Sequence, residues 1–142
     1  MKLSKSTELA IHGLYQLATE RPNQLLVADM AESQNVSPSY LAKVFQKLAR
    51  KGLVNSTRGK KGGFRLAREP KEISMADVVR AVEAEEPLFD CLKIVRCCEE
   101  ENGNCVLRKA FEDAERSMYD TLSKTTLSDI LESEHGQRTN WT

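Results

Sequence analysis

The sequence predicts a mostly helical protein with one small β-hairpin. Apolar residues recur every three or four positions in several segments, and this spacing gives a helix one apolar face. Two short strand-like runs flank a glycine-rich basic tip, which is typical of a hairpin. The length of 142 residues allows one domain, or a small domain with an appendage, and excludes a large two-domain enzyme.

Three helices are expected in the first fifty residues. The first runs from about residue 4 to residue 18, and the second from Leu26 to about Ser33. Ser37 followed by Pro38 marks the start of the third, because serine caps a helix and proline fits its first position. The inward stripe of the first helix consists of Leu9, Ala10, Gly13, Leu14, Leu17 and Ala18.

The predicted hairpin follows the third helix directly. Its strand-like runs are Leu53–Thr57 and Phe64–Ala67, joined by a basic tip at 58–63. Helix, turn, helix and basic hairpin together indicate a winged helix-turn-helix. We therefore expect a DNA-binding domain over residues 1–73.

Residues 74–133 form a second predicted unit. Ser74 and Asp77 cap a helix that runs to about Glu83, and the four cysteines follow it. A long helix from about Cys105 then carries an apolar stripe that needs a partner, and its members are Leu107, Phe111, Ala114, Met118 and Leu122.

The chain is expected to end in a short helix and a tail. Thr126 and Asp129 cap the helix, which is predicted to end near Leu131. Residues 134–142 are polar enough to form a flexible tail.

The charges are divided between the two halves although the net charge is zero. Residues 1–73 hold 13 basic and 6 acidic residues, and residues 74–142 hold 8 and 15, so the halves carry +7 and −7. No acid lies between Glu32 and Glu69, a stretch with nine basic residues. This stretch predicts an anion-binding surface.

Seven residues are the candidate DNA contacts. The second helix of a helix-turn-helix enters the major groove, and the wing tip can contact phosphate or the minor groove. The alternative, that these charges only solvate a helix and a turn, is less favoured because no acid interrupts them. No phosphate-loop motif is present, so nucleotide hydrolysis is disfavoured. The candidates are Ser39, Tyr40, Lys43, Lys47, Arg58, Lys60 and Lys61.

The four cysteines, Cys91, Cys97, Cys98 and Cys105, lie within 15 residues. No apolar run is long enough for a membrane span, and the first residues lack a signal-peptide pattern, so we expect a cytoplasmic protein. In a reducing compartment, metal ligation or redox chemistry is favoured over structural disulfides. Buried structural cysteines and a thiol switch remain alternatives, and the spacing matches neither a zinc ribbon nor a ferredoxin.

Several segments together form a specific pattern, namely Met1–Ser4, Ser37–Leu41, Gly52–Val54, Arg58–Phe64 and the cysteine loop. With them the chain resembles, from Met1 to about Ser133, the iron–sulfur winged-helix transcription regulators typified by IscR, NsrR and RsrR. The resemblance implies a homodimer joined through the long helix. It also implies an iron–sulfur cluster held by Cys91, Cys97 or Cys98, and Cys105.

The chain departs from IscR-type members at two positions. Arg108 stands where those members have a histidine ligand, and Ala42 stands where they often have an acid in the recognition helix. The RsrR-like branch is similar to this chain in having an acid and a histidine at Glu8 and His12. In that branch a 2Fe–2S cluster bridges the dimer, with two cysteines from one chain and the Glu and His of the other.

Residues Glu8 and His12 are also one helical turn apart, so both can reach one iron. The alternative is a surface glutamate paired with a partly buried histidine. Carboxylate and imidazole ligation would raise the reduction potential of the cluster, and a 2Fe–2S cluster is favoured over 4Fe–4S.

The sequence therefore predicts a homodimeric regulator that binds double-stranded DNA under the control of an iron–sulfur cluster. Redox state, iron and nitric oxide are the candidate signals. The alternative is a cluster-free winged-helix regulator that senses thiol oxidation or a small ligand. An enzyme is not expected, because a catalytic cysteine needs a nearby base and the only histidines are His12 and His135.

Overall fold

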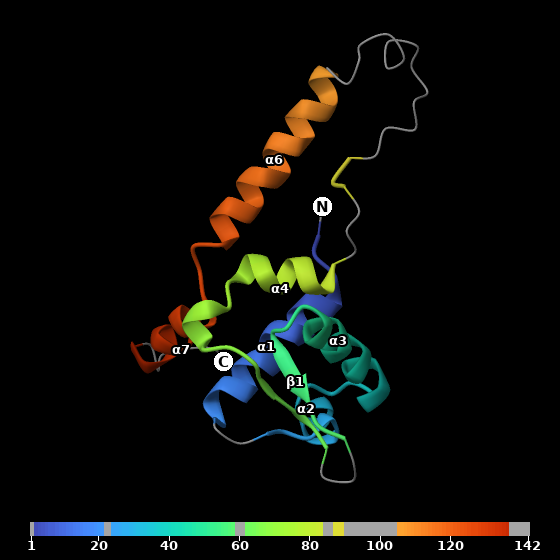
Figure 1. The fold of residues 1–142 in the computed structure, drawn as a ribbon, viewed down its shortest axis with the longest axis vertical. Coiled ribbons are helices and arrows are strands. Elements are labelled where there is room, and N and C mark those ends of the chain that lie inside the picture. Colours follow the sequence, from blue (N-terminus) through green and yellow to red (C-terminus); the bar gives the residue numbers. More distant parts are fainter. Residues whose placement is uncertain (1, 22–23, 59–61, 84–86, 90–104, 137–142) are drawn as a thin grey trace.

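A computed structural model describes residues 2–21, 24–58, 62–83, 87–89 and 105–136 of the chain. Helix α1 (Lys5–Thr19) lies at the centre of its core and contacts α3, α4, α7 and β2 (Figure 1). The predicted inward stripe of α1 is confirmed, since five of its six members are buried and Ala18 packs against the core partly buried.

Helices α2 (Val27–Ser33) and α3 (Pro38–Arg50) form the predicted helix-turn-helix. The turn between them includes Asn35, whose φ of 54° is in the left-handed region that asparagine tolerates. The Ser37 hydroxyl accepts a hydrogen bond from the Tyr40 backbone N–H at 3.2 Å, so the predicted cap is confirmed.

The hairpin pairs β1 (Val54–Ser56) with β2 (Phe64–Leu66) in antiparallel register. A third segment joins it, because Leu25 and Phe64 exchange backbone hydrogen bonds of 3.0 and 2.9 Å. Gly63 makes this approach possible, since a Cβ at that position would lie 2.8 Å from the carbonyl carbon of Leu25. The wing is therefore anchored to the chain that enters α2.

The second half of the chain contributes to the same core. The 3₁₀ helix η1 (Pro70–Glu72) leads to α4 (Met75–Val82), which begins with a capping box between Ser74 and Asp77. Leu127, at the start of α7 (Leu127–Gly136), is fully buried and its N–H donates to the Ile73 carbonyl at 2.8 Å.

Helix α7 is longer than predicted. It continues past Leu131 to Gly136, so the predicted helix end near Leu131 is wrong. Polar residues do not end a helix by themselves, and the chain has no glycine or proline in this segment before Gly136. Residues 137–142 lie outside the described residues.

Helix α6 (Val106–Leu122) extends away from the rest of the molecule (Figure 1). None of its residues is buried, and Val106 and Leu107 are 81% and 53% exposed. Near its C-terminal end, the Arg80 guanidinium of α4 lies 4.4 Å from the centre of the Tyr119 ring. Among the described residues, no helix is both long and apolar enough to cross a membrane.

The contact between α1 and α3 has no room for a side chain at Gly13. A Cβ there would come within 2.6 Å of Cε2 of Phe45, a fully buried ring. The Gly13→Ala variant gains about 1 kcal/mol of helix propensity but loses about 1–3 kcal/mol to overpacking. We therefore expect a lower free energy of unfolding, measured by urea denaturation.

The matched control is Gly13→Ala in a Phe45→Leu background. The smaller side chain relieves the overlap, so the alanine should cost less there than in the wild type. Equal costs in the two backgrounds would show that the Phe45 ring does not limit the site.

Candidate functional site

The outer face of α3 presents three of the predicted DNA contacts. Ser39 and Lys43 are exposed and Tyr40 is 38% exposed, whereas Leu41 and Phe45 are buried on the inner face. The Tyr40 hydroxyl is 2.8 Å from the Ser6 hydroxyl of α1, an interaction that the sequence analysis did not predict. The ring of Tyr40 is therefore held in place on the exposed face.

Lys47 differs from the other predicted contacts on α3. Its side-chain ammonium donates a hydrogen bond of 3.1 Å to the backbone carbonyl of Val82, at the last turn of α4. The side chain of Lys47 therefore extends from the recognition helix α3 to α4. To contact a phosphate, Lys47 would have to break its hydrogen bond with the Val82 carbonyl.

The wing carries a fifth predicted contact, Arg58, which is exposed. Lys60 and Lys61 lie outside the described residues. Thr57, which the sequence analysis did not single out, fixes the base of the wing: its hydroxyl donates to Gln24 at 2.9 Å and accepts from the Gly63 N–H at 3.0 Å. A threonine at a strand end is the signal that could have indicated this contact.

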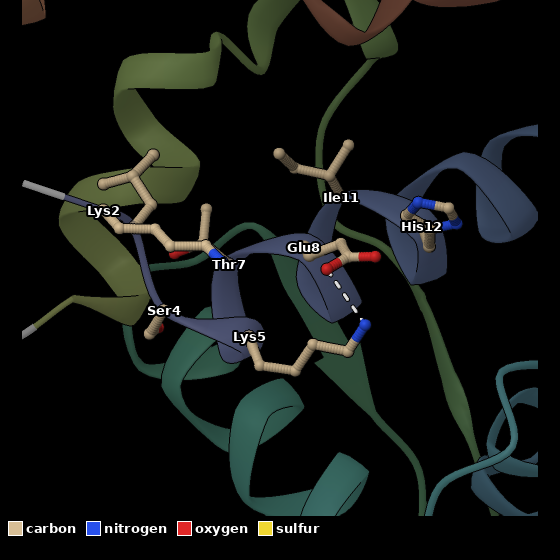
Figure 2. A pocket seen from close by; sticks show the side chains of 8 residues that line it. Lys2, Ser4, Lys5, Thr7, Glu8, Ile11 and His12 are labelled. Atoms are coloured by element: carbon tan, nitrogen blue, oxygen red, sulfur yellow. Dashed lines mark hydrogen bonds and ion pairs between the residues drawn. The ribbon is translucent and has the colours of Figure 1, made fainter.

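Glu8 and His12 lie one turn apart on α1 and both are exposed (Figure 2). They line a hollow of about 360 Å³ together with Thr7, Ile11 and residues 2–5 of the N-terminal segment. Glu8 forms an ion pair of 2.9 Å with Lys5, so the alternative of a Glu8–His12 pair is not what the structure shows.

The Glu8 carboxylate is held in its ionised form. The hydrogen bond from Lys5 and the Lys5 charge lower the pKa of Glu8, with smaller contributions from His12 and Lys2, and they outweigh the opposing effect of burial. Iron is bound by ionised carboxylates, so this state suits a ligand. Because the Glu8–Lys5 pair is exposed, it can exchange for another partner at small cost.

The cysteines are only partly described. Among the described residues, Cys105 is a half-buried free cysteine, and it occupies the N-cap position of α6 without a side-chain capping bond. Cys91, Cys97 and Cys98 lie outside the described residues. In the part of the chain that the structure describes, no three His, Cys, Asp or Glu residues gather into a group that could hold a metal.

Two described residues that flank the stretch 90–104, Phe89 and Cys105, both lie at α6. The Phe89 ring stacks on the Phe111 ring of α6 with centroids 4.5 Å apart and planes at 11°. Cys105 lies just before α6, less than two turns from Phe111.

The fold and the basic surface define a winged-helix DNA-binding protein. The chain belongs to the Rrf2 family, described as "Iron-dependent Transcriptional regulator", which it matches over residues 3–133. It is 32% identical over 138 residues to the transcriptional regulator NsrR of Bacillus licheniformis, covering 92% of each protein. NsrR of Bacillus subtilis is also 32% identical, over 141 residues and 94% and 92% of the two chains.

Solved structures give the same assignment. IscR of T. potens has a TM-score of 0.72 and 26% identity, covering 100% of this chain and 94% of that one. The oxidised form of CymR from Staphylococcus aureus has a TM-score of 0.67 and 27% identity, covering 92% and 95%. These findings confirm the predicted family and fold, and the protein is a transcriptional regulator rather than an enzyme.

Removing Arg58 should weaken DNA binding without changing the preferred sequence. If Arg58 contacts one phosphate, Arg58→Ala reduces the slope of log K against log salt by about 0.9. A titration of duplex DNA by fluorescence anisotropy at several salt concentrations measures this slope.

The control is Arg116→Ala, which removes the same charge from α6, far from the wing in Figure 1. It should leave the slope unchanged. Equal slopes for Arg58→Ala and the wild type would place Arg58 away from the phosphates.

Proposed function

We propose that the protein is a homodimeric regulator in the cytoplasm whose affinity for double-stranded DNA depends on an iron–sulfur cluster. The observation that carries this proposal is the double role of α1. Its exposed face holds Glu8 and His12, and its buried face packs through Gly13 against Phe45 of the recognition helix. A change at the exposed face therefore acts on a helix that is in direct contact with the DNA reader.

The available donors are of the types that iron accepts. Thiolate sulfur, imidazole nitrogen and carboxylate oxygen all ligate iron in proteins. Two arrangements of these donors are candidates. One arrangement uses Cys91, Cys97 or Cys98, and Cys105 of a single chain.

The second arrangement combines two chains, and we favour it for a 2Fe–2S cluster. Here Cys98, or Cys97 in its place, and Cys105 of one chain meet Glu8 and His12 of the other. When bound, such a cluster supplies a one-electron redox couple. The exposure of Glu8 and His12 supports this arrangement, because both side chains can be reached from outside their own chain.

A cluster-free regulator is the second candidate. The similarity to the oxidised form of CymR, together with the half-buried thiol of Cys105, favours sensing by thiol oxidation. Absence of iron after anaerobic reconstitution, with DNA binding intact, would support this candidate against the first.

The role of His12 can be tested by spectroscopy. We expect the anaerobically reconstituted wild type to show 2Fe–2S absorption and close to two irons and two sulfides per cluster. His12→Ala removes the proposed nitrogen ligand, so the absorption spectrum and the reduction potential of the cluster should both shift.

The chain offers a matched control in His135→Ala, which removes its other histidine from α7. This variant should keep the wild-type spectrum and potential. An unchanged spectrum and potential in His12→Ala would exclude His12 as a ligand.

Helix α6 is the proposed dimer contact. Its apolar stripe has no buried member in the single chain, and Leu107 is 53% exposed. Leu107→Asp should therefore weaken the dimer while it leaves the core of each chain intact. Analytical ultracentrifugation over a concentration series measures the dissociation constant.

Arg116→Asp places the same residue on the opposite face of α6 and should leave the dimer unchanged. If both variants dissociate equally, the general charge of the helix rather than its apolar face governs association.

A further inference from the structure

One carboxylate joins the first turn of α1 to the end of α4. Oε1 of Glu83 accepts hydrogen bonds from the backbone N–H and the hydroxyl of Ser4, both at 2.8 Å, and from the hydroxyl of Thr7. Ser4 is the N-cap residue of α1, but its own side chain makes no capping bond. A residue 79 positions away therefore anchors the start of this helix.

The junction is partly shielded from water. Thr7 is 2% exposed and is the one buried polar residue of the described chain. Burial acts to raise the pKa of Glu83, but the hydrogen bonds from Thr7 and Ser4 and the charge of Lys47 outweigh it, so the pKa is lowered. The carboxylate is thus ionised, and charged hydrogen bonds are the stronger kind.

The same junction is connected to the recognition helix at two points. Lys47 of α3 donates to the carbonyl of Val82, the residue before Glu83. Ser6 lies between Ser4 and Thr7 in the chain, and its hydroxyl is 2.8 Å from the hydroxyl of Tyr40 on α3. A displacement of this junction would therefore reach α3 near both of its ends.

The junction is also close in sequence to the parts of the chain that the proposed function assigns to sensing. Glu8 follows Thr7 directly and shares the first turns of α1 with Ser4. Beyond Glu83 the chain continues toward residues 90–104 and their three cysteines. Both sensing segments are thus attached to the residues that Glu83 joins.

We propose that Glu83 is a positioning residue that couples the sensing segments to the recognition helix. It fixes the first turn of α1 to the last turn of α4, so that the two move together and carry Tyr40 and Lys47 with them. This inference rests on the proposed function, because it assumes that the state of the sensing segments changes DNA affinity.

The test compares DNA affinity in two states of the full-length protein. One sample is reconstituted anaerobically with iron and sulfide, and the other is stripped of metal with a chelator. The DNA probe is a duplex selected by the wild-type protein from a random-sequence pool. Typical couplings change affinity roughly 5- to 150-fold, and we expect Glu83→Gln to bring the ratio of the two dissociation constants close to one.

Two further variants make the result specific. Glu20→Gln removes the same charge just beyond the other end of α1 and should keep the wild-type ratio. Thr7→Val keeps the side-chain shape and removes one donor, so it should reduce the ratio even if Glu83→Gln folds poorly. A wild-type ratio in both Glu83→Gln and Thr7→Val would overturn the proposal.

Hydrogen exchange separates this proposal from the proposed function. If wild-type affinity is the same in both states, the proposed function fails, and the junction is then judged by exchange alone. Faster exchange in residues 4–9 and in α3 of Glu83→Gln, with no change in α7, supports the mechanical link. Unchanged exchange in α3 contradicts it.

Discussion

The ring of Phe45 connects α1, the recognition helix α3 and the wing. It is fully buried on α3, it lies against Gly13 of α1, and its centroid is 5.1 Å from that of Phe64 in the wing. Packed interiors have little free volume, so none of these elements can shift alone without opening a cavity or forcing an overlap. The aromatic contact of Phe45 with Phe64 thus helps to fix the orientation of the wing relative to the recognition helix. Leu25 adds to it by pairing with Phe64, which ties the wing to the entrance of α2.

The zero net charge of the sequence corresponds to a separation of charge in space. The acid-free stretch from residue 33 to residue 68 forms α3 and the hairpin, whereas the acids of the second half include several on α6. In Figure 1 the hairpin and α6 point toward opposite ends of the molecule. A basic stretch arranged in this way attracts phosphates to α3 and the hairpin.

Local signals in the sequence predicted most of the fold. Ser37, Ser74 and Thr126 were expected to cap helices, and each accepts a hydrogen bond from a backbone N–H three residues later. Such contacts depend on neighbours in the chain, so spacing reveals them. The end of α7 was not predicted, because polarity alone does not stop a helix. The contacts of Lys47 with Val82 and of Glu83 with Ser4 were not predicted either, since both join residues that are distant in sequence and carry no local signature.

The two faces of α1 connect the residues proposed for sensing with the recognition helix. The buried stripe is fixed by its partners, and Gly13 leaves no space for adjustment against Phe45. The exposed face, with Glu8 and His12, has no such restriction, so its donors can be recruited without repacking the core. A force applied at these donors cannot be absorbed by sliding at the Gly13 contact, because the ring lies directly against the backbone. The force must instead move α1 as a unit or distort the hydrogen bonds that join Ser4 and Thr7 to Glu83. Both responses displace Ser6, whose hydroxyl contacts Tyr40 on α3.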